Sequence, residues 1–326
     1  MDRSADEIVF TKDGCNFCEQ AIKALKDIEY TAINIPKSKG QYDCLIGLSG
    51  GVDSSTVLHY AVKMGLRPMC FTLDNGWNSK ESDENVLKMV EKLKVPLYRY
   101  SIDRKKFTKL QSAFMHAGVK NIEIPTDHVL MAVSYELADK YGIRTILSGG
   151  NVSTESIMPP SWGYNARDLT HIKEIYKRFT GNKLTGLPTC SLLKWNYYRW
   201  IKGIKVLYPL DAFDYNRETS IEVLKDAYGY VPYGDKHCES TFTTWFQNFY
   251  LYEKFGIDKR KAHLSSLIVS GQMTREEALN KLTESPVYPE LGLEKKVLKY
   301  PKHEHSDYPQ DKWYERIAWF INLWKF

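Results

Sequence analysis

The residues best suited to chemistry form one short run of glycines and hydroxyl side chains, Ser49-Gly50-Gly51-Val52-Asp53-Ser54-Ser55. The run follows an apolar segment typical of a strand and precedes an amphipathic segment typical of a helix. Gly50 and Gly51 would let the backbone approach an anion, and the N–H groups at a helix N-terminus favour negative charge. With hydroxyl donors from Ser49, Ser54 and Ser55, the run predicts a phosphate-binding loop.

Asp53 is the residue of this loop that would repel a phosphate directly. We expect its carboxylate to hold Mg²⁺, which would bridge it to phosphate oxygens. No Gly-Lys-Ser or Gly-Lys-Thr follows, so the loop is not a Walker A motif. An ordinary glycine turn with a serine cap is the alternative, and the agreement of the whole run in type and context argues against it.

Alternating strand and helix patterns surround the loop. Apolar strands are predicted at 44–49, 67–73, 96–102 and 144–147, and helices at 54–64 and around 86–93 and 129–137. Strands separated by helices of this length indicate βαβ units and therefore an α/β fold with a parallel sheet flanked by helices. The charged run at 103–106 is interpreted as a solvated loop.

Other polar residues should meet the loop, because ligands of such sheets bind where the strands end. The candidates follow predicted strands or open a helix: Thr72, Asp74, Thr126, Asp127, Gly149, Gly150, Asn151 and Glu155. For Thr126 and Asp127 a simple helix N-cap is an equally good explanation.

The pattern changes after about Pro209, where helical periodicity dominates. A capping box at 274–277 opens one helix, and a last helix carries an apolar stripe from Trp313 to Trp324 that we expect in a core or an interface. We predict three parts: a small segment 1–38 with a cysteine pair, an α/β domain 39–210, and a mainly helical region 211–326.

Composition limits the class of protein. The net charge of +5 is mild for 326 residues and fits binding of nucleotides, without the basic stripe expected of a nucleic-acid binder. The polar, acidic start lacks the features of a signal peptide, and no stretch approaches the ~20 apolar residues of a membrane helix. We expect a cytoplasmic protein that neither binds nucleic acid nor inserts into a membrane.

The loop resembles the PP-loop of the N-type ATP pyrophosphatases, which include GMP synthetase, NAD synthetase, asparagine synthetase and tRNA-thiolating enzymes. The resemblance implies an adenine nucleotide alpha hydrolase-like fold, ATP and Mg²⁺ as cofactors, and transfer of AMP to a substrate oxygen with release of pyrophosphate. It implies that Thr72 and Asp74 lie near the adenosine. It also implies that the loop from Gly149 to Glu155 approaches the α-phosphate and the substrate, with Asn151 as a substrate residue.

Three segments of the second half, at 236–243, 254–265 and 270–279, are similar to the N-acetyl sugar amidotransferases of bacterial surface polysaccharide biosynthesis. With the loop, this resemblance covers about residues 8 to 285. It implies that an acetamido group of a nucleotide-activated sugar, such as a UDP-2,3-diacetamido uronic acid, becomes an acetamidino group for lipopolysaccharide O-antigen. A related branch uses pseudaminic acid for flagellin glycans.

Residues of these segments then acquire expected roles. Lys236 and Arg260 could offset negative charge on phosphates or on a sugar carboxylate. Glu239 could hold Mg²⁺ or accept a proton from the attacking ammonia, and Ser240 and Lys259 are expected to contact substrate. For such charge-dense segments, a surface ion-pair network is the alternative.

The resemblance also implies partners and a metal. No Gly-x-Cys-x-Gly elbow is present, so ammonia would come from a separate glutaminase and a cyclase-like barrel, similar to the two subunits of imidazole glycerol phosphate synthase. In the family a further Cys-x-x-Cys usually precedes Cys15 and Cys18, and four thiolates would bind Zn²⁺. Cys190 and Cys238 could complete such a set, and a turn with free thiols is the alternative.

Two other functions remain open at this point. An RNA-modifying sulfur transferase would share the PP-loop but would need a reactive cysteine at the site and a basic RNA-binding surface. A degenerate PP-loop could instead serve as a nucleotide sensor or an assembly scaffold. The intact Asp53 and the serines of the loop argue against the second of these.

Overall fold

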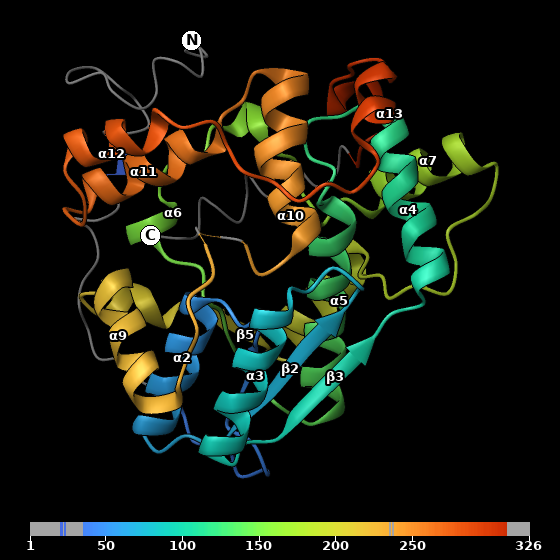
Figure 1. Ribbon diagram of the computed structural model, residues 1–326. Coiled ribbons are helices and arrows are strands. Elements are labelled where there is room, and N and C mark those ends of the chain that lie inside the picture. The colour runs from blue at the N-terminus through green and yellow to red at the C-terminus, as the bar shows by residue number, and fades with distance from the viewer. Residues whose placement is uncertain (1–19, 22, 24–34, 235, 237, 312–326) are drawn as a thin grey trace.

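A five-stranded parallel sheet forms the centre of the computed structural model (Figure 1), which describes residues 20, 21, 23, 35–234, 236 and 238–311. Its strand order is β3-β2-β1-β4-β5, and every neighbouring pair is parallel. The strands are β1 (Cys44–Gly47), β2 (Pro68–Asp74), β3 (Leu97–Ser101), β4 (Thr145–Leu147) and β5 (Lys205–Leu207). The predicted α/β class is confirmed.

The central strands are buried on both faces, as expected for a parallel sheet covered by helices. Because successive side chains alternate, Leu45 and Phe71 point into one core while Ile46 and Cys70 point into the other. The register aligns Leu45 with both Met69 and Ile146. All five strands therefore end at one common edge.

Helices cover both faces. The core on one face is formed with α2 (Val52–Lys63), α3 (Lys80–Leu93) and α9 (Arg217–Tyr228). The core on the other face is formed with α4 (Arg104–Ala117), α5 (Ile124–Lys140) and α7 (Leu169–Thr180). Two helices are shorter. Helix α6 (Val152–Glu155) follows β4, and helix α8 (Leu192–Asn196) precedes β5 and continues as a π-helical turn to Ile201.

The interpretation of the charged run at 103–106 as a loop is wrong. Asp103 is the N-cap of α4, and its side chain accepts a hydrogen bond from the Lys106 N–H at 3.1 Å. The helix buries Phe107, Leu110 and Phe114 at helical spacing. The charges occupy only its first turn, where they conceal the apolar period that follows.

The mainly helical character of the region after β5 is confirmed. Helices α10 (Thr241–Trp245, continuing to Lys254), α11 (Lys259–Val269), α12 (Arg275–Leu282) and α13 (Glu294–Lys299) lie above the sheet in Figure 1, at the end toward which its strands point. Both hydrogen bonds of the predicted capping box at Thr274 and Glu277 are present. Within the described part of the chain, every helix falls short of the length and apolarity that crossing a bilayer requires.

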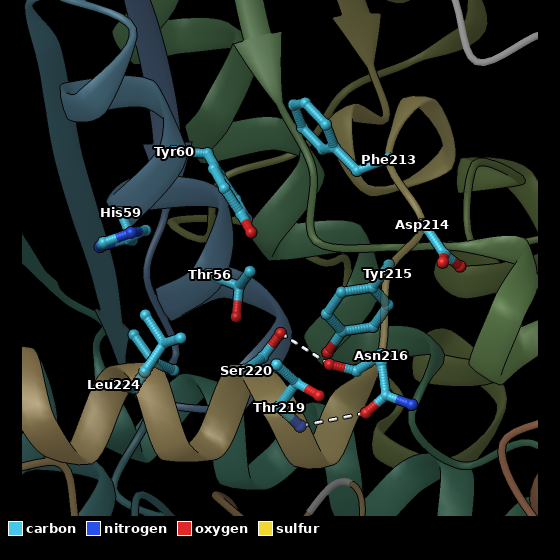
Figure 2. Close-up of a pocket in the computed structure, with 11 residues that line it drawn as sticks. Thr56, His59, Tyr60, Phe213, Asp214, Tyr215, Asn216, Thr219, Ser220 and Leu224 are labelled. Carbon is cyan, nitrogen blue, oxygen red and sulfur yellow. Dashed lines mark hydrogen bonds between the residues drawn. The ribbon is translucent and has the colours of Figure 1, made fainter.

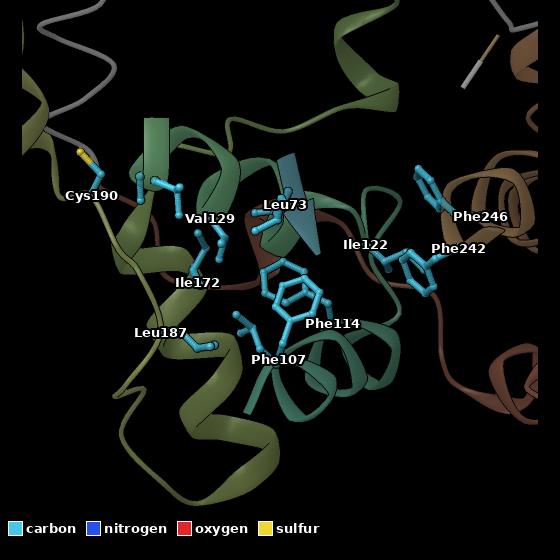
Figure 3. Packing of buried hydrophobic residues seen from close by; sticks show 14 of the residues in the cluster. Leu73, Phe107, Phe114, Ile122, Val129, Ile172, Leu187, Cys190, Phe242 and Phe246 are labelled. Atoms are coloured by element: carbon cyan, nitrogen blue, oxygen red, sulfur yellow. The ribbon is translucent and has the colours of Figure 1, made fainter. Parts of the chain in front are cut away.

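The helical region shares a hydrophobic core with the sheet. Figure 3 shows Phe242 of α10 beside Ile122, in the same buried cluster as Phe107 and Phe114 of α4. The predicted boundary at residue 210 therefore separates two sequence patterns that pack together. The cysteine pair at 15 and 18 and the apolar stripe of the last predicted helix lie outside the described residues.

The last described segment wraps around the end of α4. Gly118 has φ +64°, and a Cβ there would lie 1.8 Å from the Pro301 carbonyl oxygen. The His303 N–H donates to the Gly118 carbonyl at 3.1 Å, and the Tyr308 hydroxyl donates to the Ala117 carbonyl at 2.8 Å. The turn after α4 thus holds the last described segment through its own backbone, which contacts the Pro301 and His303 backbone and the Tyr308 hydroxyl.

Two buried histidines complete this contact. Because a carbonyl can only accept, His171 Nδ1 donates to the Pro309 carbonyl (3.3 Å), and its Nε2 is left to accept from His305 Nδ1 (3.0 Å). His305 Nε2 then accepts from the Asn121 N–H at 3.2 Å. Each of the four ring nitrogens has a suitable hydrogen-bond partner only when both imidazole rings are neutral. Burial accordingly lowers the pKa of His171, and burial with repulsion from His171 lowers the pKa of His305 to about 3.

We predict that acid destabilises the fold through these histidines. In the unfolded chain they take up protons below the ordinary pKa of 6.5, while His305 in the folded protein does not until about pH 3. Stability should therefore be lost as pH falls from 6.5 toward 3, by about 1.4 kcal/mol per pH unit for His305, with a loss of the same sign from His171. Urea unfolding at several pH values measures this slope. His305→Gln should reduce the slope and His303→Gln, at a partly exposed ring, should not; equal slopes in both would contradict the assignment.

Candidate active site

A cavity of about 830 Å³ opens at the carboxyl edge of the sheet. Its walls come from the glycine-serine loop, the ends of β1, β2 and β4, the first turn of α5, and the segment that leads into α10. Residues far apart in the sequence thus meet at the edge where the fold class predicts a ligand.

The loop presents the features of an anion site. Gly51 is the extended N-cap of α2, and the first intrahelical hydrogen bond runs from the Ser55 N–H to the Gly51 carbonyl at 3.1 Å. The N–H groups of the preceding turn are therefore not used inside the helix. The Ser49 and Ser54 hydroxyls lie 3.2 Å apart, and Ser49 Oγ accepts from the Gly51 N–H. These contacts fix the hydroxyls at the helix N-terminus.

At two positions glycine is required because the backbone of another segment, rather than a ligand, occupies the place of a side chain. Gly50 has φ +80°, and a Cβ there would lie 2.2 Å from the Ser82 carbonyl oxygen of α3. A Cβ on Gly149 would lie 2.9 Å from the Ser54 backbone nitrogen. Gly149 thus lets the end of β4 rest directly on the phosphate-binding loop.

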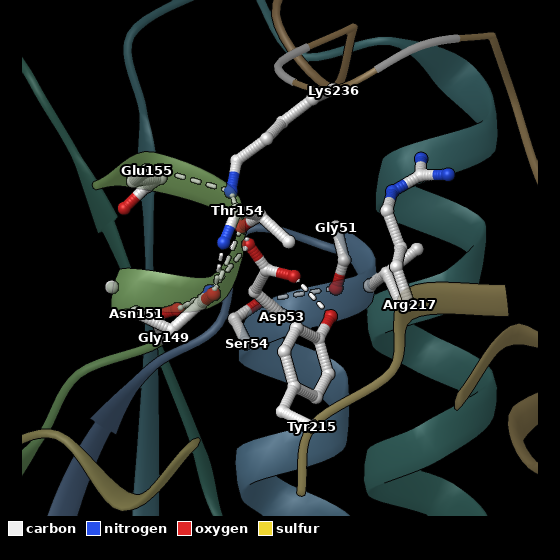
Figure 4. Close-up of polar contacts among 12 residues, drawn as sticks. Gly51, Asp53, Ser54, Gly149, Asn151, Thr154, Glu155, Tyr215, Arg217 and Lys236 are labelled. Carbon is white, nitrogen blue, oxygen red and sulfur yellow. Dashed lines mark hydrogen bonds and ion pairs between the residues drawn. The ribbon is translucent and has the colours of Figure 1, made fainter. Parts of the chain in front are cut away.

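Asp53 is the centre of a polar network that draws on three other segments (Figure 4). Its Oδ2 accepts from Lys236 Nζ at 2.9 Å and from Asn151 Nδ2 at 3.3 Å, while its Oδ1 accepts from the Tyr215 hydroxyl. Lys236 Nζ also lies 3.1 Å from Glu155 Oε1. Burial and the negative charge of Asp53 raise the pKa of Tyr215 well above its usual range, so this hydroxyl is a permanent donor.

The donor set around Asp53 fits Mg²⁺. Each carboxylate oxygen has about two lone pairs, so the bond from Tyr215 leaves Oδ1 one pair for a cation. Mg²⁺ usually takes one or two carboxylates and completes its shell with phosphate oxygens and water. Bound there, Mg²⁺ would neutralise charge on the phosphates of a nucleotide. For zinc, no group of three or more His, Cys, Asp or Glu side chains is arranged as a metal site anywhere in the described ranges.

Three further carboxylates line the cavity and hold protons unusually strongly. Burial, followed by repulsion from Asp127, raises the pKa of Glu123 to about 8. Burial raises the pKa of Asp127 to about 6, although its side chain is open to the cavity and Lys259 opposes the shift. Burial also raises the pKa of Glu239, with Asp53 adding to the effect and Lys236 opposing it.

Most of the predicted site residues meet in this cavity. Its lining includes Ser49, Gly51, Asp53, Ser54, Thr72, Thr126, Asp127, Gly149, Gly150, Glu155, Lys236, Glu239 and Ser240. Asn151 lies behind the wall, where its amide positions Asp53. Ser55 is buried within α2. Lys259 faces Asp127 and Glu123 from α11.

Two predicted residues are directed elsewhere. The Arg260 guanidinium bonds to the carboxylate of Asp258, the N-cap of its own helix, and to the Glu284 carbonyl. Asp74 pairs with Arg104 at 3.1 Å and accepts from the Gly76 N–H. Both side chains are held by these partners and lie outside the cavity lining, so neither is placed to contact a ligand in the cavity.

The sequence did not reveal several lining residues. Arg217 and Trp195 come from segments without a motif, and Arg167 packs over the Trp195 ring at 4.8 Å. Tyr215, which donates to Asp53 without lining this cavity, also carries no sequence signal. Glu123 could have been predicted from the sequence, because it stands four residues before Asp127 and so lies on the same helix face.

A smaller cavity of about 390 Å³ lies between α2 and the start of α9 (Figure 2). Tyr60 and Phe213 stack there with ring centroids 4.9 Å apart. It contains none of the loop serines and glycines, but Tyr215 borders it while donating to Asp53. The larger cavity is therefore the candidate active site.

Comparisons with known proteins agree with this geometry. A family model described as NAD synthase matches residues 26–188, half of the chain, and one described as "LPS biosynthesis protein WbpG-like, C-terminal domain" matches residues 239–308. A protein of Methanocaldococcus jannaschii described as "Uncharacterized protein MJ1599" is 22% identical over 273 residues, which are 82% of each chain.

Solved structures with some similarity include a U34-tRNA thiolase from Methanococcus maripaludis (10% identity, 89% of each chain, TM-score 0.38). An NMN synthetase from Francisella tularensis shares 17% identity over 63% of this chain and 98% of its own, with TM-score 0.30. An NH3-dependent NAD synthetase from Campylobacter jejuni shares 14% identity over 68% of this chain and 96% of its own, with TM-score 0.29.

A parallel sheet with this loop at its edge defines a PP-loop ATP pyrophosphatase, an ATP-dependent enzyme. The C-terminal match narrows the class, because the matched region supplies Glu239 and Ser240 to the same cavity. The chain belongs to the NAD synthase-like PP-loop ATP pyrophosphatases, and its residues 239–308 match the C-terminal domain of the WbpG-like LPS biosynthesis proteins.

We predict that Gly149→Ala impairs the loop. The added methyl group would press on the backbone of Asp53 and Ser54, and such overpacking costs about 1–3 kcal/mol. Because the reactive geometry of the loop bears this cost, ATP-dependent pyrophosphate release should fall roughly 5- to 150-fold, since each 1.4 kcal/mol is about a factor of ten. Gly163→Ala is the matched control, because nothing lies within 4 Å of its Cβ position. Full activity of Gly149→Ala would show that the loop tolerates the contact.

Proposed function

We propose that the enzyme converts an acetamido group of a nucleotide-activated sugar to an acetamidino group, with ATP and ammonia as co-substrates. The sugar we propose is a UDP-2,3-diacetamido uronic acid, made for lipopolysaccharide O-antigen. Ammonia would come from a separate glutaminase and a cyclase-like barrel protein. The resemblance of segments 236–243, 254–265 and 270–279 to the N-acetyl sugar amidotransferases supports this choice.

One observation carries the proposal: Lys236, from a segment that bears the sugar-amidotransferase resemblance, forms an ion pair with Asp53 of the PP-loop. The same lysine reaches Glu155 at the end of the β4 loop. The parts that resemble the sugar enzymes and the part that resembles ATP pyrophosphatases therefore build one site.

The chemistry divides among these residues. The N-terminus of α2 and the hydroxyls of Ser49 and Ser54 would receive the phosphates of ATP. Lys236 is placed to neutralise charge that develops when AMP is transferred to the amide oxygen. An amide oxygen is a poor leaving group, and transfer of AMP to this oxygen creates a good one. Ammonia then adds at the amide carbon and AMP departs with the oxygen.

The cavity disfavours the sulfur-transferase alternative. Such chemistry needs a nucleophilic thiolate at the site, yet among the described lining residues there is no cysteine. Cys190 is 1% exposed, and burial raises its pKa to about 11. Cys44 and Cys70 are buried in the sheet, with pKa values raised to about 12.

The proposed function predicts sugar-dependent release of pyrophosphate. With ATP, ammonium chloride and a UDP-diacetamido uronic acid, the enzyme should form AMP, pyrophosphate and a product about one mass unit lighter, as oxygen is replaced by NH. Mass spectrometry of the sugar and a pyrophosphate assay measure both. Reactions without sugar or with unmodified tRNA are the controls. Release that depends on tRNA and not on sugar would favour the sulfur transferase instead.

Asp53→Ala should abolish this turnover and leave the fold intact. The substitution removes the proposed Mg²⁺ ligand, while Lys236 keeps Glu155 as a partner. A loss of more than about 10²-fold is expected, with a change in unfolding temperature of only a few degrees. Asp139→Ala is the matched control, since it also removes one carboxylate from an ion pair, with Lys202 at 2.7 Å. An active, folded Asp53→Ala enzyme would refute the role of Asp53.

A further inference from the structure

Two carboxylates at the start of α5 stand apart from the PP-loop yet line the same cavity. Glu123 and Asp127 are one helical turn apart and so lie on one face of the helix. The proposed reaction assigns them no task, although placing two acids together in a protein-lined cavity is costly without a ligand or a proton to separate them.

The surroundings of Glu123 hold it in a defined orientation. Thr243 Oγ1, in the first turn of α10, donates to Glu123 Oε2 at 2.9 Å. The charged groups that face the carboxylate are Asp127 on its own helix, Lys259 on α11 and Glu239 ahead of α10. Lys259 in turn faces Glu155 and Lys236, which connects this acidic pair electrostatically to the PP-loop network.

We propose that Glu123 and Asp127 form a subsite for ammonium, and that Glu123 is the base that removes its proton. The inference rests on the proposed amidotransferase reaction. Ammonium has four N–H donors and one positive charge, which suits two carboxylates that converge on a cavity. Nitrogen that enters the cavity as ammonium, rather than as ammonia delivered by a partner, has no lone pair and cannot attack carbon, so a base must act before the C–N bond forms.

The step balances in protons and electrons. One proton passes from ammonium to a Glu123 carboxylate oxygen, and the nitrogen lone pair forms a bond to the adenylylated amide carbon. The C–O bond breaks, and AMP leaves with its electron pair and the former amide oxygen. Two of the three protons of ammonia remain on the new nitrogen of the amidinium product, beside the proton of the former amide nitrogen. The third proton leaves with AMP, and Glu123 returns its proton to solvent.

The titration of the pair suits this task. A carboxylate of ordinary pKa is a weak base toward ammonium, whereas burial brings the pKa of Glu123 to about 8 and that of Asp127 to about 6. Near neutral pH the pair can therefore hold one proton and one negative charge. General bases work best with a pKa close to the working pH.

Hydroxylamine distinguishes a base from a merely structural residue, because it is largely neutral at pH 7.5 and needs no deprotonation. In Glu123→Gln, AMP formation with ammonium chloride should fall about 10²-fold or more, while the rate with hydroxylamine stays close to that of the parent enzyme. The ammonium-dependent rate of the parent should rise with pH through the Glu123 titration, and the variant should lose that rise. Asp127→Asn should raise KM for ammonium more than it lowers kcat.

Glu136→Gln is the matched control, because Glu136 lies on the same helix and pairs with Lys194 at 2.6 Å outside the cavity lining. It should react with both nucleophiles like the parent. Equal losses with ammonium and hydroxylamine in Glu123→Gln, or an unchanged ammonium rate, would overturn the base assignment.

A second measurement does not depend on the sugar. At pH 8.5, ammonium chloride should raise the unfolding temperature of the parent above that in sodium chloride of equal ionic strength, because a bound ligand stabilises the folded state. Asp127→Asn should lose this difference. A parent without ammonium-specific stabilisation would refute the subsite. Stabilisation without sugar-dependent turnover would leave the subsite standing and reject the proposed sugar reaction.

Discussion

The ion pair between Lys236 and Asp53 is the contact on which the site depends. It joins a loop at the start of the sheet to a segment almost two hundred residues later, and its side chains are 12% and 19% exposed, so water screens the pair only partly. Glu155 and Tyr215 bind the same two side chains and add two more segments. Because Lys236 has two carboxylate partners and Asp53 has three donors, the four segments hold one another in position around the site.

The cavity concentrates acids as well as cations, and the balance between them is uneven. Lys236 forms ion pairs with both Asp53 and Glu155. Glu123 and Asp127, by contrast, interact electrostatically with the more distant Lys259. The first group is held by ion pairs beside the PP-loop, and the second retains protons more strongly. One cavity thereby contains a region suited to anions and a region suited to a small cation, as the proposed reaction of ATP, an amide and ammonia would require.

Sequence patterns were sufficient where the signal is local. The four predicted strands, the loop at Ser49–Ser55 and the capping box at Thr274 are all read from neighbouring residues, and the structure contains each of them. The pattern failed for α4, whose charged first turn precedes its apolar period, and for Arg260, which is drawn to its own N-cap. Tyr215 could not be predicted from the sequence, because its contact with Asp53 arises from tertiary packing and no residue spacing indicates it.

The wrapped C-terminal segment has a consequence for how the chain folds as it is synthesised. The Tyr308 hydroxyl and the Pro301 backbone contact the end of α4, and His171 of α7 donates a hydrogen bond to the Pro309 carbonyl. A nascent chain on the ribosome can form the sheet, but it cannot satisfy these groups until residues 301–309 have emerged from the exit tunnel. The native core is therefore completed only after that point of synthesis, and until then the partly folded sheet carries exposed apolar surface that chaperones recognise.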